Sequence, residues 1–340
     1  MKKMPLAYGI VLFFIFIYSL IAPASEAAAI IADHQAAANF NNIPHDFIEQ
    51  VKTTQVIFYG HTSHGSQIVS GMTILKDSSS LYDFKNGEGT LYMSEYSDDL
   101  GHVGDTSWVP ITRARLEDPS YDFNVVMWSW CGGCSDNTEE GINIYLNAMN
   151  GLEADYPEVT FIYMTGHLDG TGVDGNLYRS NNQIRAYCQA NDKILFDFAD
   201  IESYDPDGTY YPDETDACYW CYDWCAAHDC HSCDVCAHSH CYNCYLKGKA
   251  FWWMMARIVG WTEDPNCCEG VTGNVNCSSD ENPDITDITR LIDHLYLSHA
   301  PLCCPEEADI NATGGEPDMT DITRLIDYLY ISQIPLPACP

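Results

Sequence analysis

The sequence predicts an α/β fold in which helices cover both faces of a parallel sheet. Four short apolar runs, at 56–59, 123–130, 159–165 and 194–198, each end at glycine or polar residues. Runs of this kind are typical of buried strands. Between them, apolar residues recur at helical spacing, and strands that alternate with helices indicate a doubly wound parallel sheet.

The first half of the chain supplies one helix, one strand and a second helix. Residues 43–51 are expected to form a helix, because Pro44 suits a first turn and later apolar residues share one face. The strand at 56–59 and a helix at 66–75 follow. Residues 77–122 are rich in Ser, Asp, Gly and Tyr, and we expect extended loops there.

The second half continues the alternation. The strand at 123–130 ends at Cys131-Gly-Gly-Cys134, and apolar residues from Ile142 to Leu152 then recur at helical spacing. The strand at 159–165 and the helix at 178–189 lead to the strand at 194–198. An apolar helix at 251–259 closes this domain, which we expect to span 30–262.

Polar residues follow each of the predicted strands. They are Ser63, Gly132, His167 and Asp200. Ligands bind beyond the carboxyl ends of the strands in open α/β sheets, so these residues are expected to gather on one rim. The most notable loop is His61-Thr-Ser-His-Gly65, which places a serine between two histidines just before a helix. The plainer alternative is a loop serine with two surface histidines.

The N-terminus has the pattern of a secretory signal peptide. Lys2 and Lys3 precede the apolar run 6–21, and Ala22-Pro-Ala24 supplies small residues for cleavage, with a second possibility at 27–29. We expect residues 1–24 to be the signal peptide. A retained membrane anchor is the alternative, but the run is short for a bilayer crossing and no second one occurs. The mature protein is therefore expected to be secreted and to have no membrane partner.

The net charge limits the class of partner. Forty-nine acidic residues against fifteen basic ones give a formal net charge of −34. Such a charge argues against nucleic acid or an anionic membrane as partner. It suits cation binding or a saline environment, and composition does not separate the two.

The chain from about 52 to 261 resembles the SGNH (GDSL-like) hydrolases, which are serine esterases of flavodoxin-like architecture. The resemblance rests on His61-Thr-Ser-His-Gly65, on Tyr178–Arg185, on Leu195–Ser203 and on the segment Cys236-Ala-His-Ser-His-Cys241. In that family a serine attacks the ester, a histidine acts as general base and backbone amides hold the oxyanion.

The resemblance implies a set of site residues. Ser63 would be the nucleophile and His238 the base, with His240 as a close rival. Asp234 is the candidate acid, although it lies four residues before His238 where the family has three. The candidates for lining the oxyanion site are Gly101, Gly132, Asn137 and His167.

Eight cysteines between Cys218 and Cys244 form a cysteine-rich insert. Cys-x-x-Cys pairs suit tetrahedral zinc, whereas export and the even number favour disulfides. We favour disulfides and keep zinc as the alternative. The whole chain has seventeen cysteines, an odd number, so at least one thiol is free, metal-bound or paired between chains.

A tandem repeat occupies the C-terminal region, 271–333. The segment 284–296 recurs at 318–330 with an offset of 34 residues, and an Asn/Asp-rich loop precedes each copy. The region resembles an all-α dockerin, a calcium-binding pair of loop–helix units that docks exported enzymes onto cohesin-type receptors or cell-surface scaffolds. The calcium ligands implied by this resemblance are Asn274, Asn276, Ser278, Asp284, Asp287, Asp309, Asn311, Thr313, Asp318 and Asp321.

Both loops are longer than the twelve-residue calcium loop, the first by two residues and the second by one. A solvated acidic pair of helices is the alternative for this region. Cys303, Cys304 and Cys339 are expected to staple the module to itself or to Cys267 and Cys268.

Together these features predict an exported ester hydrolase that removes O-acyl groups from carbohydrate and carries a docking module. The substrate class follows only from the enzymes that dockerins usually accompany. The rival hypothesis is a non-catalytic extracellular binding protein with a degenerate hydrolase domain. The spacing of Asp234 favours the rival, and the Ser63 loop favours the enzyme.

Overall fold

The computed structural model describes residues 29–85 and 87–262, and residues 271–337 except 277, 279–281, 298–301, 303 and 314–316. The expected signal peptide and the segment 263–270, between the two expected domains, lie outside the described residues.

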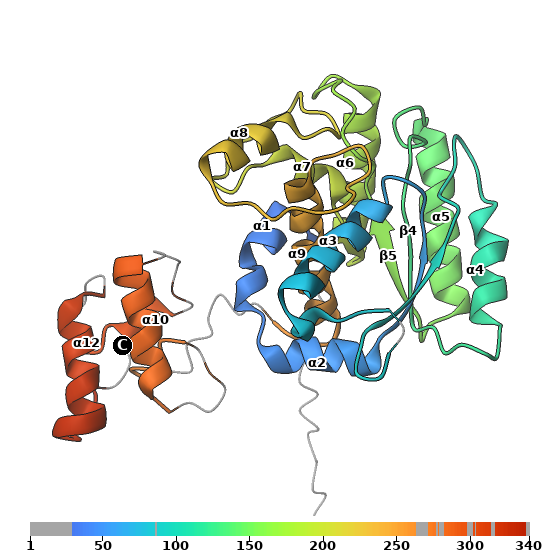
Figure 1. The fold of residues 1–340 in the computed structure, drawn as a ribbon. Helices are drawn as coiled ribbons and strands as arrows, with labels where there is room; N and C mark the ends of the chain where they lie inside the picture. The colour runs from blue at the N-terminus through green and yellow to red at the C-terminus, as the bar shows by residue number, and fades with distance from the viewer. Residues whose placement is uncertain are drawn as a thin grey trace, which may run out of the picture.

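The first part is built on a six-stranded sheet in which all strands are parallel (Figure 1). The strand order is β1-β6-β5-β4-β2-β3. The strands are β1 Ile30–Ala32, β2 Val56–Gly60, β3 Tyr92–Tyr96, β4 Val125–Trp128, β5 Thr160–Met164 and β6 Ile194–Phe196. The four predicted strands are β2, β4, β5 and β6, which occupy the centre of the sheet and confirm the expected α/β class.

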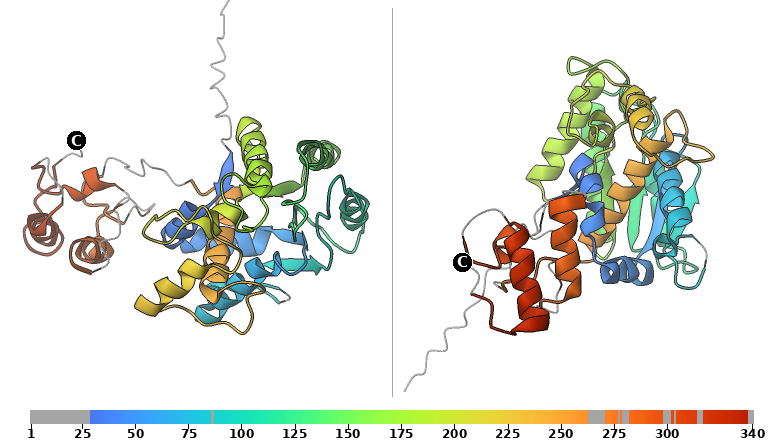
Figure 2. Two further views of the ribbon diagram at one scale, coloured as in Figure 1. Left: turned by 90° about the horizontal axis from the view of Figure 1, so that it is seen from above. Right: turned by 60° about the vertical axis from the view of Figure 1, so that its left-hand side comes forward.

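Successive residues of the central strands enter two different hydrophobic cores. Val125 and Met127 of β4 belong to one core, and Val126 and Trp128 belong to the other. The first core is completed by α1 His34–Ala38, α2 His45–Thr54, α3 Ser66–Ser78, α7 Phe198–Ser203 and α9 Cys241–Ile258. The second is completed by α4 Trp108–Leu116, α5 Glu139–Asp155 and α6 Asn176–Ala190. Helices therefore cover both faces of the sheet, as the view from above also shows (Figure 2).

The expectation of loops over 77–122 is wrong in two places. The strand β3 lies at the edge of the sheet, where it pairs only with β2, and its alternating Tyr92-Met-Ser-Glu-Tyr96 pattern buries one residue. The helix α4 contains Pro110 in its first turn and buries Trp108 and Thr112. Both elements carry too few buried apolar residues to produce a periodic pattern in the sequence.

The helix α9 begins ten residues earlier than predicted, at Cys241. The side chain of His240 caps it by accepting a hydrogen bond from the Tyr242 amide at 3.1 Å. The cysteine-rich insert ahead of it contains α8 Tyr219–Ala227.

The second described part has its own small core, which includes Val275, Leu291, Ile310 and Leu325. Its two repeat helices are α10 Ile285–Ile292 and α12 Met319–Ile326, and each continues into a π-helical turn, at 293–297 and 327–331. The short helix α11 Pro305–Ala308 lies between them in the chain. Asp284 and Asp318 start their helices with the same capping box, so the sequence repeat is also a structural repeat.

Candidate active site

The candidate site lies at the point in the sheet where the strand order reverses. The chain runs from β2 outward to β3 and then crosses back to β4 on the other side of β2. The loops that follow β2 and β4 therefore diverge at their carboxyl ends, which is where open α/β sheets bind ligands. Ser63 and His64 follow β2, and Cys131 follows β4.

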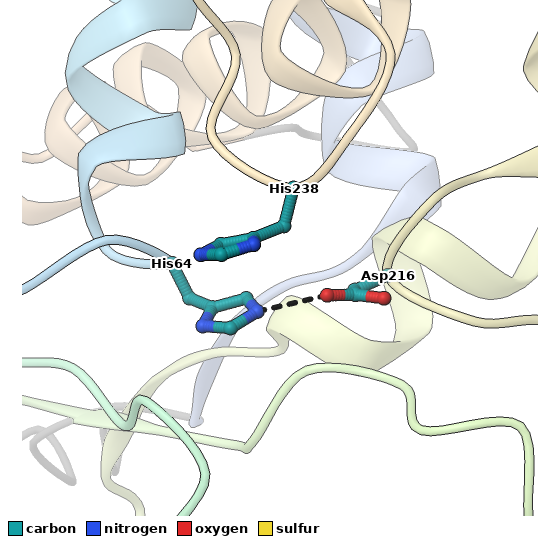
Figure 3. Close-up of side chains that lie close together, drawn as sticks. All are labelled: His64, Asp216 and His238. Carbon is teal, nitrogen blue, oxygen red and sulfur yellow. Dashed lines mark hydrogen bonds and ion pairs between the residues drawn. The ribbon is translucent and has the colours of Figure 1, made fainter.

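His64 is the centre of the site. Its Nε2 lies 2.9 Å from Oδ2 of Asp216 (Figure 3). Its Nδ1 lies 3.3 Å from Sγ of Cys131. A carboxylate accepts hydrogen bonds, so the Asp216 contact favours the tautomer with the proton on Nε2. The lone pair of Nδ1 then faces the thiol.

The surroundings of His64 favour its neutral form. Burial of the ring and the nearby His167 lower the pKa of His64 to about 4, although the hydrogen bond to Asp216 acts in the opposite direction. The rings of His64 and His167 are stacked, with centroids 3.6 Å apart. At neutral pH the ring is therefore a free base held in a fixed orientation.

Ser63 contacts the same thiol as His64. Its Oγ is 3.3 Å from Sγ of Cys131, and its carbonyl oxygen accepts a hydrogen bond of 2.6 Å from Oγ of Ser66, the first residue of α3. Gly65 allows the loop to close against the residue that follows β4, because a Cβ at this position would lie 2.1 Å from Oγ of Ser129. The serine and the thiol thus meet at one point of the rim.

His238 reaches the same place from the insert. Its ring stacks on that of His64 with centroids 4.5 Å apart, and its backbone adopts a φ of 62°. The preceding carbonyl, of Ala237, accepts a hydrogen bond of 2.6 Å from Nε2 of Gln67 in α3. The histidine predicted as base therefore covers His64, and its described contact is a ring stack.

The structure places the other two predicted catalytic residues away from this cluster. His240 caps α9 and its ring meets the edge of Tyr222. Asp234 is exposed and lies with Ser70 and Thr73 in a shallow groove beside α3. The carboxylate that contacts a histidine of the site is that of Asp216, which the sequence reasoning missed. It is 152 residues from His64 in the chain, so no short spacing could have revealed it.

The four predicted site-lining residues have different surroundings. The Gly101 amide donates to Oδ1 of Asp99 at 2.9 Å, and Gly132 forms a turn in which its carbonyl accepts from Ser135. The Asn137 amide group is buried and donates to the carbonyl of Gly133 at 3.0 Å. Of the four, only His167 contacts His64 in the described structure.

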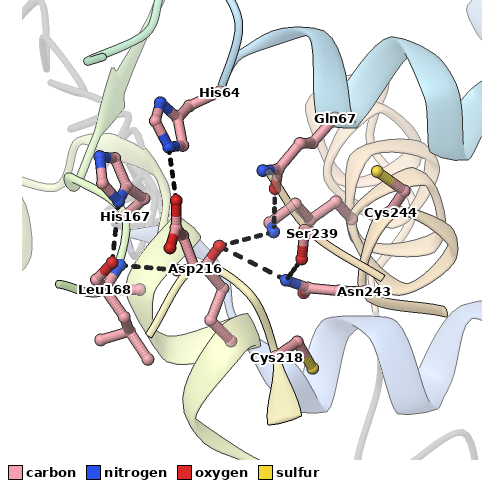
Figure 4. A network of polar contacts seen from close by, with 12 residues as sticks. His64, Gln67, His167, Leu168, Asp216, Cys218, Ser239, Asn243 and Cys244 are labelled. Atoms are coloured by element: carbon pink, nitrogen blue, oxygen red, sulfur yellow. Dashed lines mark hydrogen bonds and ion pairs between the residues drawn. The ribbon is translucent and has the colours of Figure 1, made fainter. Parts of the chain in front are cut away.

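A buried polar network lies behind the site (Figure 4). Nζ of Lys247 in α9 donates to Oε1 of Glu202 in α7 at 2.8 Å and to Oε1 of Gln67 in α3 at 2.6 Å, and all three side chains are buried. The other oxygen of Glu202 accepts from the Leu168 amide at 2.7 Å, next to His167. The network therefore links the supports of both rings that stack on His64.

All eight cysteines of the insert are in disulfides. The pairs are Cys218–Cys221, Cys225–Cys230, Cys233–Cys241 and Cys236–Cys244. The disulfide alternative is the one present, and in this state these eight residues offer no thiolate to zinc. Two of the bridges enclose the loop that carries His238. Among the described cysteines, Cys131, Cys134 and Cys188 are free.

The C-terminal repeat brings its predicted ligands together in two equivalent loops. In the first, Oδ1 of Asp287 accepts from the Asn276 amide at 2.9 Å, and in the second, Oδ1 of Asp321 accepts from the Asn311 amide at 3.0 Å. Asn274 and Asp309 occupy matching places, because their Oδ1 atoms accept from the amides of Ser278 and Thr313. Asp284 and Asp318 also cap the helices that follow.

This donor set fits calcium in its chemistry. Every predicted ligand offers oxygen, and burial raises the pKa of Asp287, which a bound cation would offset. Cys304 is disulfide-bonded, and the other cysteines predicted to staple the module lie outside the described residues.

Within the described residues, no helix combines the length and apolar character that a bilayer crossing requires. In comparison with known proteins, no protein-family model and no curated protein matches the chain.

Proposed function

We propose that the protein is a secreted ester hydrolase in which Ser63 is the nucleophile and His64, oriented by Asp216, is the general base. One observation carries the proposal: the His64 ring is held between the Asp216 carboxylate at 2.9 Å and the point where Ser63 and Cys131 meet. Nucleophilic hydrolases use a base that a third group orients. His64 combines such an orienting group with a thiol contact that it shares with the Ser63 hydroxyl.

In this proposal the reaction has two halves. Oγ of Ser63 attacks the ester carbonyl carbon while its proton passes to Nδ1 of His64, and that proton then goes to the departing alcohol oxygen. Water repeats the sequence on the acyl-serine, and the acid is released. The sequence favoured His238 as base, but the proposal gives this role to His64 because its orienting carboxylate is present.

A second candidate is a thiol hydrolase with Cys131 as the nucleophile. It is favoured by the direct contact of 3.3 Å between Sγ of Cys131 and Nδ1 of His64. In that case the thiolate attacks the ester, and a thioester replaces the acyl-serine as the intermediate.

Hydrolysis of p-nitrophenyl acetate by the mature chain distinguishes these candidates. We expect Ser63→Ala and Asp216→Asn to lower kcat by roughly 10²- to 10⁴-fold, because nucleophile, base and orienting acid act as one unit. Cys131→Ala is expected to retain most of the activity. The matched control is Ser80→Ala, which removes an exposed hydroxyl beyond the far end of α3.

The other outcomes assign the roles differently. Loss of activity in Cys131→Ala together with survival in Ser63→Ala would establish the thiol nucleophile. A loss of activity in His238→Ala as large as that in His64→Ala would indicate that His238 acts as a general base. Activity that none of these substitutions lowers would refute a nucleophilic hydrolase at this site.

The fold supports the choice of hydrolase family. The order β3-β2-β4-β5-β6 corresponds to the flavodoxin-like order 2-1-3-4-5 when these strands are counted in chain order, with β1 added beside β6. This order is compatible with an SGNH-like domain. An O-acyl group on carbohydrate remains the proposed substrate class.

The C-terminal repeat is proposed to be a dockerin-like module that binds calcium and attaches the enzyme to a cohesin-like receptor or scaffold. The equivalence of the two loops supports this proposal, with Asn274, Asn276 and Asp287 as ligands in the first and Asp309, Asn311 and Asp321 in the second. Bound calcium would supply positive charge that joins each loop to the start of its helix. The disulfides of the insert support export.

A further inference from the structure

A hollow lies beside the candidate active site. It has a volume of about 230 Å³, and its walls come from the loop after β5, from α6, from α7 and from residues 204–214. It contains none of the residues that contact His64. This volume is slightly below the usual range for ligand pockets, roughly 300–1,000 Å³, and suits one small ring.

The hollow and the site share a wall. Residues 168–170 pair with residues 214–216 through a bridge between Asp169 and Thr215. Two backbone hydrogen bonds of 3.1 Å flank the bridge, from the Asp216 amide to Leu168 and from the Gly170 amide to Glu214. His167 and Asp216 sit at one end of this wall in the site, whereas Leu168, Asp169 and Glu214 line the hollow. A molecule in the hollow would therefore contact the same pair of segments that carries His167 and Asp216.

Aromatic rings supply much of the apolar surface of the hollow. Tyr178, Tyr204 and Tyr210 line it, and Tyr178 and Tyr210 are 37% and 44% exposed. The ring of Tyr204 stacks on the rings of His34 and Tyr210, with centroid distances of 3.9 and 4.9 Å. Stacking therefore fixes the rings of Tyr204 and Tyr210, and the surface that these two rings present is preformed.

The polar groups of the hollow are mainly acceptors. Asp169, Asp200 and Glu214 contribute carboxylates, and Asn182 contributes an amide. The Arg185 guanidinium also lines the hollow, but Asp197 holds it through two hydrogen bonds of 2.6 and 2.7 Å. The net charge of the lining is therefore negative, which disfavours an anionic ligand.

We propose that this hollow binds one neutral sugar ring of the carbohydrate whose ester is cleaved at the site formed by Ser63 and His64. The exposed rings of Tyr178 and Tyr210 can offer apolar surface to the C–H faces of a pyranose. Carboxylates and amides accept hydrogen bonds from its hydroxyls. The inference rests on the proposed function for the location of the ester, but it concerns a separate binding site.

Binding is tested without catalysis. The mature full chain is titrated by calorimetry with deacetylated xylo-, gluco- and manno-oligosaccharides, with oligogalacturonate as an anionic probe and tetramethylammonium as a cationic one. We expect at least one neutral oligosaccharide to bind and oligogalacturonate not to bind. Tyr210→Ala should weaken that binding by about tenfold, the upper range for the loss of one aromatic contact.

The matched control is Tyr219→Ala, which removes a tyrosine that is 65% exposed on α8 and does not line the hollow. Three results would overturn the proposal: no neutral sugar binds, Tyr210→Ala and Tyr178→Ala bind as the wild type does, or tetramethylammonium binds instead of sugar. The last result would identify a cage for organic cations.

Kinetics separate failure of this inference from failure of the proposed hydrolase. With an acetylated oligosaccharide, Tyr210→Ala should raise KM by about tenfold. It should leave turnover of p-nitrophenyl acetate unchanged, because that ester carries no sugar. Hydrolysis of the small ester without sugar binding would refute the sugar subsite alone, whereas sugar binding without any hydrolysis would refute the enzyme alone.

Discussion

A histidine accepts a proton only while one of its ring nitrogens has a free lone pair, and the surroundings of His64 maintain that state. Asp216 holds the proton on Nε2, and the imidazole rings of His167 and His238 both stack on the ring of His64. Protonation of His64 would create a positive charge on a buried ring beside His167 and His238, and this lowers the pKa of His64. The residues that orient the base thus also determine the pH range in which it can act.

The expected consequence is activity that persists into acid solution. The pKa of His64 is lowered to about 4, so its neutral form predominates above that pH and is lost as the pH falls through it. We expect the acid limb of the kcat/KM profile to have its midpoint near pH 4. His167→Asn removes one of the causes of the shift, so its acid limb should move upward toward pH 6.5.

The profile is measured from pH 3.5 to 8 with p-nitrophenyl acetate, and circular dichroism at each pH confirms that the protein remains folded. His228→Asn, at the exposed end of α8, serves as the control and should leave the profile unchanged. A midpoint between pH 6 and 7 that His167→Asn does not shift would contradict this role for the neighbouring ring.

At the scale of elements, the site depends on the close contact of α3 with α9. A Cβ on Gly71 would lie 1.8 Å from the carbonyl oxygen of Cys244, and one on Gly248 would lie 2.3 Å from the carbonyl carbon of Gly71. Only glycine at both positions allows this approach. It brings the helix that follows Ser63 against the helix that follows His238.

The buried network of Lys247, Glu202 and Gln67 joins these helices to α7. Removing one member of a buried ion pair leaves its partner charged and without compensation, which typically costs about 3–5 kcal/mol. We therefore expect Lys247→Ala to lower the free energy of unfolding by about that amount. The double variant Lys247→Met with Glu202→Leu should recover much of the loss, because no buried charge remains.

Urea unfolding of the oxidised protein, followed by tryptophan fluorescence, measures both effects. The control is Arg113→Met, which breaks a pair with Asp155 in which both side chains are exposed, and such exposed pairs contribute little to the free energy of unfolding. Equal midpoints for Lys247→Ala and Arg113→Met would show that the buried network does not support the fold.

At the scale of the whole molecule, the sequence predicts the centre of the sheet better than its edges. The strands β2, β4, β5 and β6 are apolar on both faces, so they appear as continuous apolar runs. The edge strands β1 and β3 are short or half-exposed and leave no such run. The helix lengths were underestimated where capping and disulfides, rather than periodicity, set the ends, as at Cys241.

The same distinction applies to the candidate site. The loop with Ser63 could be found because strand, loop and helix are consecutive in the sequence. Asp216 could not be found, because its position depends on the pairing of residues 168–170 with 214–216, a long-range contact without local sequence signal. The sequence suggests His238 as base with Asp234 as its acid, whereas in the structure the ring of His238 stacks on that of His64.

The net charge of −34 and the C-terminal repeat lead to one further prediction, on the response of the full chain to cations. Any salt should stabilise so acidic a protein by screening its self-repulsion. Calcium should stabilise the repeat more than other salts do, because Asp287 and Asp321 are buried among converging oxygen ligands. A bound ion adds roughly 2.7 kcal/mol to the free energy of unfolding when its concentration is a hundred times its Kd.

Scanning calorimetry of the oxidised full chain tests this prediction in NaCl, MgCl₂ and CaCl₂ at equal ionic strength, with chelator in the NaCl sample. We expect calcium alone to raise the Tm of one transition, assigned to the repeat, and Asp287→Ala with Asp321→Ala to abolish that increment. Of the single variants, Asp321→Ala should lose more, because its loop contains three acids, with Asp309 and Asp318, and one inserted residue. Identical transitions in calcium and in sodium chloride would instead support an acidic pair of helices that binds no specific ion.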